Sequence, residues 1–215
     1  IKLPINVKVK AGDDWRDCRD HVRRLLGMGQ WEPQRRQLPR QRSRPIRPDD
    51  TDHVARQAAK ANWLWRRRQP ALGSLAEIYL RCRRGYSGPI PATIAFLPPS
   101  NPNQHPAMIA AFGITHEPEP GITAIRDEDV HGVHLTLLRA DGSDKADAPQ
   151  NKLMVGICKG SPIVLAPPND LLGLAICEGI EDALSVYRAT GLGAWAAGSA
   201  GFMPALAGAV PDYVE

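Results

Sequence analysis

The sequence lacks the features of membrane and secreted proteins. No run approaches the ~20 apolar residues that a bilayer-spanning helix needs. The first residues, IKLPINVKVKAGDDW, contain no long apolar core of a secretory signal. We therefore expect a cytoplasmic protein that contacts no membrane.

Cysteine is also scarce. The four cysteines lie far apart and form no C-x-x-C pair, so the spacing favours neither a zinc ribbon nor a disulfide framework. Cys18 and His21 form a C-x-x-H pair, but two ligands are half of a zinc site and no second pair follows at a usual spacing. We expect reduced cysteines and favour a metal-free helix around Cys18 and His21.

Each sign of charge is concentrated in a different part of the chain. Residues 1–70 carry 18 basic and 8 acidic side chains, a net charge of +10, whereas residues 71–215 carry 9 and 15, a net charge of −6. A basic front part before an acidic part is typical of a nucleic-acid-binding segment that leads into a carboxylate metal site. A solvated basic linker would give the same pattern, and charge alone does not decide between the two.

Helices and a linker are predicted in the N-terminal part. Asp14–Leu26 has apolar residues at helical spacing, and the Arg-, Gln- and Pro-rich stretch after it indicates a linker. Further helices are predicted at His53–Arg68 and at Ser74–Arg83, the second with Ser74 and Glu77 as a capping box.

Short apolar runs in the middle of the chain predict strands of one mainly antiparallel α+β unit. These runs lie at 93–97, 107–114, 121–127, 130–140, 151–157 and 162–165. After them, the continuously apolar Leu174–Cys177 predicts a strand covered on both faces. A helix at Glu181–Thr190 ended by Gly191, then a strand at Ala194–Ala197, completes a β-α-β unit, so the fold class is α/β.

The turn of this unit carries the acidic sequence Glu178-Gly179-Ile180-Glu181-Asp182. Open α/β sheets bind ligands at the carboxyl ends of their strands, where Glu178 is expected. Asp182 lies four residues on and reaches the same side, so the two carboxylates could hold Mg²⁺. Complementing the helix dipole also explains Glu181 and Asp182, and we assign Glu181 to that role alone. It does not explain Glu178.

The segment LAICEGIEDALSVYRATGLGAWAAGSAG resembles the first motif of the Toprim domain of bacterial primases, topoisomerases and related phage and plasmid proteins. Glu178, Gly179 and Asp182 match that motif position by position. GSLAEIYLRCRRGY, PAMIAAFGI, VHGVHLTLLRADGSDKA and NKLMVGICKGSPIVLAPP resemble the primase-like proteins of mobile elements, so the resemblance covers residues 53–215. It implies an α+β primase-like domain in 51–168 and the N-terminal part of a Toprim domain in 169–215, while the composition of 1–50 indicates a basic N-terminal helix and linker.

One part of the Toprim pattern is missing. The family has a second motif, Asp-x-Asp, after a later strand, and no such motif follows Glu178 before the chain ends at Glu215. Asp127-Glu128-Asp129 has the spacing but precedes Glu178, which is the wrong order. We therefore expect residues 1–215 to be inactive alone.

Several basic residues are candidates for nucleic-acid contacts. Lys152 resembles a lysine that precedes the Toprim domain in primases, although a surface lysine of a hairpin would look the same. Arg66, Arg67 and Arg68 follow Trp63 and Trp65, a combination found where single strands bind. Tryptophans that anchor a helix to the core are the commoner alternative. His131 and His134 are interpreted as strand side chains rather than ligands.

The resemblance implies Mg²⁺-dependent nucleotidyl transfer on a single-stranded DNA template, as in primer synthesis. Glu178 would be a metal ligand or an acid/base, Asp182 a metal ligand, and nucleotides and a replicative helicase would be partners. A noncatalytic DNA-binding or assembly module with a vestigial Toprim fold is the alternative.

Overall fold

The computed structural model describes residues 48–119, 122–169 and 172–211 together with His21, Arg24 and Gly27, and for residues 48–51 it describes the backbone alone. The chain divides into two compact units, Ile1–Pro45 and Ile46–Glu215, and the second is described below. Cys18, the rest of the predicted helix Asp14–Leu26 apart from His21 and Arg24, and the Arg-rich linker up to residue 47 lie outside the described residues.

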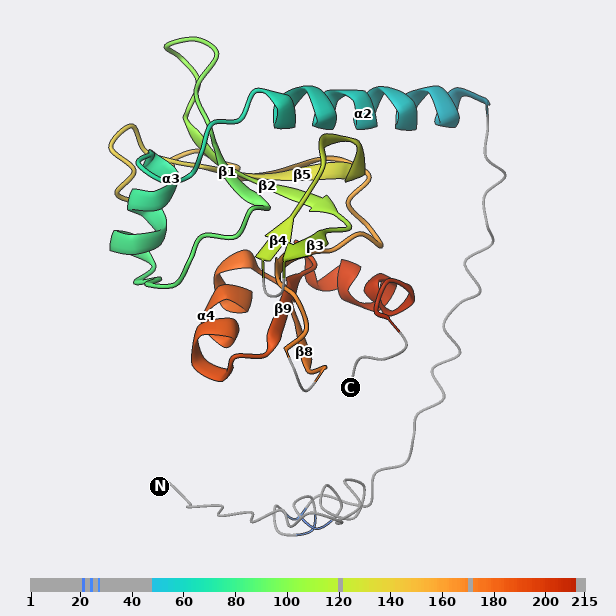
Figure 1. Ribbon diagram of the computed structural model, residues 1–215. Coiled ribbons are helices and arrows are strands. Elements are labelled where there is room, and N and C mark those ends of the chain that lie inside the picture. The colour runs from blue at the N-terminus through green and yellow to red at the C-terminus, as the bar shows by residue number, and fades with distance from the viewer. Residues whose placement is uncertain are drawn as a thin grey trace. The chain divides into compact units, whose positions relative to one another are not determined.

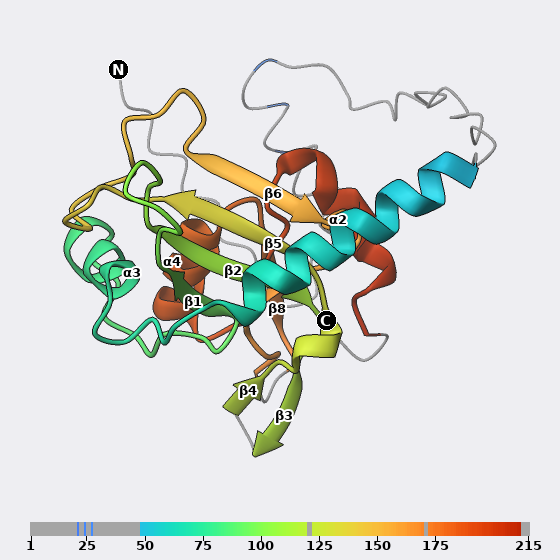
Figure 2. The same cartoon turned by 90° about the horizontal axis from the view of Figure 1, so that it is seen from above.

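Four strands form an antiparallel sheet, seen edge-on in Figure 1, and Figure 2 shows their order β1-β2-β5-β6. They are β1 (Ile94–Leu97), β2 (Ala107–Gly113), β5 (Val130–Leu137) and β6 (Lys152–Gly156). The connection from β2 to β5 carries a hairpin of β3 (His116–Glu119) and β4 (Ile122–Ala124), followed by the 3-10 turn η2 (Asp127–Asp129). Every residue of β2 is buried, because both faces of this sheet are covered.

Helix α2 (Pro48–Arg66) lies across one face of the sheet, and its first turns extend past β6 (Figure 2). Ala61 and Trp65 are fully buried there against side chains of β2 and β5 such as Ile109 and Val133. The helix begins five residues before the predicted start at His53, with Pro48 at a position where the missing N–H costs no helical hydrogen bond.

The opposite face of the sheet is covered by a short helical segment and by the C-terminal unit. The predicted helix Ser74–Arg83 is divided into α3 (Leu75–Ile78) and a π-helical turn, η1 (Tyr79–Arg83). Ser74 caps α3 by accepting a hydrogen bond from the Ala76 N–H. The Glu77 carboxylate accepts from the N–H of Gly73 rather than Ser74, so the capping box is displaced by one residue.

The C-terminal unit is a three-stranded sheet in the order β7-β9-β8. Its elements are β7 (Ile163–Ala166), β8 (Leu174–Cys177), α4 (Ile180–Thr190), β9 (Gly193–Ala196) and the 3-10 helix η3 (Ala200–Gly208). Strands β8 and β9 are parallel and joined by α4, which confirms the predicted β-α-β connection. α4 lies on the other side of the four-stranded sheet from α2 (Figure 1).

Two expectations about this unit are wrong. Residues 162–165 were expected to continue the antiparallel sheet, but β7 pairs antiparallel with β9. All four residues of β7 are buried, because the strand lies between the two sheets. Strand β8 was expected to be covered on both faces but is only partly buried, because it is the edge strand of the described sheet.

The described part of the chain is thus a mixed α/β fold with two main sheets. None of its described helices is long and apolar enough to span a membrane.

Candidate functional site

The acidic turn lies where β8 gives way to α4. Its backbone is held by the end of β9, because the N–H groups of Ala197 and Gly198 donate to the carbonyls of Cys177 and Glu178, both at 2.9 Å. Gly179 is the N-cap residue of α4, and its carbonyl accepts from the Ala183 N–H at 3.1 Å. Glu178 therefore stands at the carboxyl end of a parallel strand, as the sequence predicted.

Glu178 and Asp182 both have exposed side chains. The Asp182 carboxylate lies over the turn, since a Cβ placed on Gly179 would be 2.9 Å from Asp182 Oδ2. Glycine at this position therefore allows Asp182 to approach the backbone next to Glu178. Among the described residues, no group of three or more His, Cys, Asp or Glu side chains is close enough to hold a metal ion.

Glu181, between these two residues, is the centre of a charged cluster. Its Oε1 accepts a hydrogen bond from the Tyr79 hydroxyl at 2.8 Å and lies 3.1 Å from Lys145 Nζ and 3.5 Å from Arg84 Nη2. Its Oε2 lies 3.8 Å from Lys152 Nζ. The Glu181 side chain is only 16% exposed. We name these five residues the Glu181 cluster.

Four chain segments meet in the Glu181 cluster. Tyr79 opens the π-helical turn and Arg84 follows it, and the Arg84 Nε also donates to the Tyr79 hydroxyl at 2.9 Å. Lys145 follows β5 in a bridge with Leu138, and Lys152 begins β6. The cluster therefore connects the four-stranded sheet and its helical cover to the first turn of α4.

The surroundings of Glu181 alter several pKa values. Burial opposes its ionisation, but its own backbone N–H, Lys152, Tyr79 and Lys145 outweigh burial and lower the pKa of Glu181 to about 2. Burial and the Glu181 charge raise the pKa of Tyr79. His134, buried nearby on β5, has its pKa lowered to about 4, first by burial and then by the charge of Lys152. Glu181 is thus a permanent anion at neutral pH.

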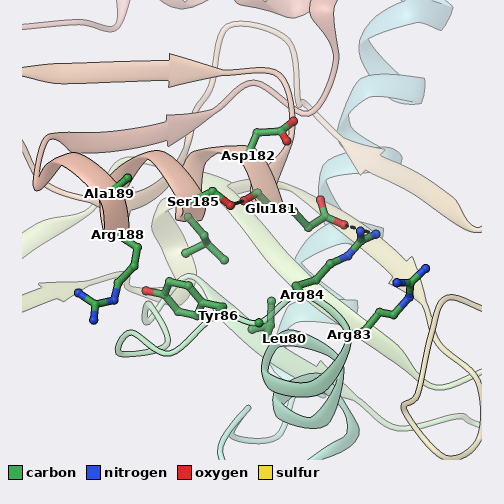
Figure 3. A pocket seen from close by; sticks show the side chains of 11 residues that line it. Leu80, Arg83, Arg84, Tyr86, Glu181, Asp182, Ser185, Arg188 and Ala189 are labelled. Atoms are coloured by element: carbon green, nitrogen blue, oxygen red, sulfur yellow. Dashed lines mark hydrogen bonds and ion pairs between the residues drawn. The ribbon is translucent and has the colours of Figure 1, made fainter.

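A pocket of about 460 Å³ opens beside the cluster (Figure 3). In Figure 3 the Glu181 side chain points toward Arg84, whereas Asp182 points away from it. The lining residues are Leu80, Arg83, Arg84, Gly85, Tyr86, Glu181, Asp182, Leu184, Ser185, Arg188 and Ala189. Arg83 is paired with Asp144 at 2.7 Å, and Arg188 donates to Ser87 at 3.3 Å. The pocket is lined by both signs of charge.

The structure corrects the role expected for Glu181, which does more than complement the helix dipole. Its partners Tyr79, Arg84 and Lys145 were not expected at the site either. One signal was available: on a helical wheel, Glu181 flanks the stripe of buried residues that includes Ile180 and Leu184. A carboxylate beside a buried stripe requires partners.

The basic candidates have different environments. Lys152 has a side chain that is partly exposed and lies beside the acidic turn, next to Glu181. Arg68 donates to Asp127 at 2.9 Å and to the Trp65 carbonyl at 3.0 Å, so its guanidinium is already engaged by the protein. Arg66 is exposed, and the Arg67 guanidinium lies 4.5 Å from the centre of the Trp63 ring.

The two tryptophans and the early D-x-D also have distinct roles. Trp65 is a core residue, whereas Trp63 is 53% exposed. Asp127 and Asp129 are paired with Arg68 and Arg126, which accounts for this D-x-D without a metal.

Comparisons with known proteins give one match. A family model described as "Domain of unknown function (DUF7146)" matches residues 55–165. Neither the comparison with curated proteins nor the one with solved structures finds a significant match. The matched range contains the cationic side of the Glu181 cluster and ends inside β7, before the acidic turn.

Proposed function

The chain belongs to the DUF7146 family, a domain of unknown function, and we propose that it is part of a Toprim-type, primase-like protein that acts on single-stranded DNA. The observation that carries the proposal is the parallel β8-α4-β9 unit, with an exposed Glu178 at the carboxyl end of β8 and Asp182 on the first turn of α4. Ligands of open α/β sheets bind at this edge.

The residues at the turn fit a magnesium site in their donor chemistry. Glu178 and Asp182 supply carboxylate oxygens, which Mg²⁺ prefers, and both are exposed to solvent that could supply further ligands. Two carboxylates are fewer than two-metal chemistry uses, so binding by this chain alone should be weak. When bound, Mg²⁺ would stabilise negative charge on a phosphoryl group during nucleotidyl transfer.

The chain's own residues add two contributions. Three cations and one carboxylate leave the Glu181 cluster with a local charge of +2, which balances the exposed carboxylates Glu178 and Asp182 and reduces their repulsion of a phosphate backbone. Lys152 is the most exposed cation of the three and is the best candidate for a direct phosphate contact. Glu178 has no ion pair with any described residue, so its carboxylate is available to an external cation.

A noncatalytic DNA-binding or assembly module is the second candidate. It is favoured by the absence, among the described residues, of any group of three or more metal-binding side chains. Such a module would bind single-stranded DNA through its basic residues and have no use for Mg²⁺ at Glu178.

Calorimetric titration of Mg²⁺ into the whole chain separates the two candidates. We expect weak binding that is lost in Glu178→Gln and at least about tenfold weaker in Asp182→Asn, because each change removes one anionic ligand. Glu119→Gln removes an equally exposed acid from β3 and should bind as the unchanged chain does. Equal affinity in all four proteins would refute a metal site at the turn, and if DNA binding persisted it would support the module.

A further inference from the structure

Helix α2 carries a basic and aromatic stripe on its solvent side. Arg56, Lys60, Trp63 and Arg67 are spaced four, three and four residues apart, so they share one face of the helix and of the turn that follows it. The stripe lies opposite the buried Ala61 and Trp65. At 1.5 Å per residue it extends over about 16 Å. These four side chains are neither part of the hydrophobic core nor part of the acidic turn.

The charges of this stripe are not neutralised by the protein. Among the described residues, no acidic side chain forms an ion pair with Arg56, Lys60 or Arg67, and the adjacent Arg66 is equally unpaired. The next arginine, Arg68, differs because Asp127 neutralises it. Four cations on α2 and the turn that follows it therefore remain available to an external anion.

Trp63 is arranged for stacking. It is 53% exposed, and the Arg67 guanidinium lies 4.5 Å from its ring centre. A single exposed tryptophan needs no special explanation by itself. An indole paired with a guanidinium between further cations presents both the π surface that takes up an unstacked base and the charge that binds its phosphate.

A groove of about 550 Å³ runs beside Trp63, between α2 and the ends of β5 and β6. Its walls include Trp63, Arg66, His131 and the 45% exposed Ile157. These side chains give an apolar and aromatic wall that includes one cation, Arg66. Glu128 is the one acidic residue among those that line it.

We propose that this stripe and groove form a binding surface for single-stranded nucleic acid, in which a base stacks on the Trp63–Arg67 pair and phosphates contact Lys60, Arg56 and Arg66. The inference rests on the proposed function for its choice of nucleic acid as the ligand, but it uses none of the residues of the acidic turn. The unpaired cations favour a polyanion over a protein partner, whose surface would have to be acidic along the whole stripe.

The test measures binding of the whole chain to an oligodeoxythymidylate of about 16 nucleotides by fluorescence anisotropy without Mg²⁺. Stacking on an aromatic side chain contributes about 1–3 kcal/mol per base, so Trp63→Leu should weaken binding by about 5–150-fold, with Trp63→Phe restoring most of the affinity. Ile122→Ala is the matched control, since Ile122 is 52% exposed and lies in the β3–β4 hairpin. It should bind as the unchanged chain does.

The salt dependence provides a second measurement. Lys60→Gln should reduce the slope of log affinity against log salt by about one phosphate contact, whereas Trp63→Leu should lower affinity and leave the slope unchanged. Equal affinity of the unchanged chain and Trp63→Leu would overturn the proposal, as would self-association of the chain that Trp63→Leu abolishes without affecting DNA binding. These readouts need no metal, so they fail or succeed separately from the Mg²⁺ titration.

Discussion

Replacing Glu181 with Gln should destabilise the protein substantially, although the two side chains have almost the same shape. The amide can keep the hydrogen bond from Tyr79 but loses the charge that balances Lys145, Arg84 and Lys152. The pKa of Glu181 is lowered from 4.5 to about 2, and at 1.36 kcal/mol per unit that difference corresponds to about 3 kcal/mol of folding free energy.

Two effects bear on this magnitude. Lys145 has a side chain that is only 20% exposed, so leaving it without its anion is costly. Lys152 is 44% exposed and can recover hydration, which reduces the loss. We therefore expect Glu181→Gln to lower the free energy of unfolding by about 2–3 kcal/mol at pH 7 and Tm by about 4–12 °C.

The pH dependence identifies the charge as the cause. Because the folded pKa of Glu181 is depressed, its contribution is complete above the unfolded value near 4.5 and is lost as pH falls toward 2. At pH 3 the difference in free energy of unfolding between the unchanged chain and Glu181→Gln should be about 2 kcal/mol smaller than at pH 7.

Urea unfolding at pH 7, 4.5 and 3 measures this difference. Asp182→Asn, an exposed acid of the same turn, is the control and should change stability by less than about 0.5 kcal/mol. Equal stability of the unchanged chain and Glu181→Gln at pH 7 would refute the electrostatic argument.

Two further predictions concern His134 and Gly198. The His134 pKa, lowered to about 4 by burial and then by Lys152, implies that stability falls as pH drops from about 6.5 toward 4; nuclear magnetic resonance titration of the ring should show it neutral at pH 5.5, and protonation near 6.5 would contradict the burial argument. Gly198→Ala should cost about 2–4 kcal/mol, since φ is +80° and the new Cβ would lie 2.7 Å from Phe112 Cζ. Gly208→Ala, where nothing lies within 4 Å, is the control for unfolding measurements and should be close to neutral.

The sequence predicted those features that are encoded by neighbouring residues. The continuous apolar run of β8, the helix of α4 and its end at Gly191 in the left-handed conformation depend on local spacing and local backbone preference. The position of Glu178 at the strand end follows from the same local pattern. These features could be predicted without knowing which distant residues contact them.

What the sequence did not predict depends on residues far apart in the chain. Tyr79 binds Glu181 across 102 positions, and no local pattern in either segment identifies the other. The apolar residues of β7 predicted a strand but contained no information about which sheet it joins. The division of Ser74–Arg83 into α and π turns depends on a hydrogen bond from the Arg84 N–H to the Tyr79 carbonyl, which aligns Tyr79 and Arg84 with the cluster.

Strand β7 determines where the chain can be cut without unfolding it. It follows the four-stranded sheet in the chain, pairs with β9 of the other sheet, and accepts a hydrogen bond at the Val164 carbonyl from the Thr93 hydroxyl next to β1. The Gly113 N–H at the end of β2 donates to the Pro162 carbonyl just before it. Strand β7 thus connects the four-stranded sheet to the three-stranded sheet.

A gene fragment that ended near residue 166 would therefore carry a fully buried strand without the partner that covers its edge. Such a fragment would expose an apolar sheet edge and would tend to aggregate. A fragment that folds on its own must therefore extend through β9, although the family match ends inside β7. The acidic turn lies between β8 and α4, so such a fragment contains it together with the four-stranded sheet.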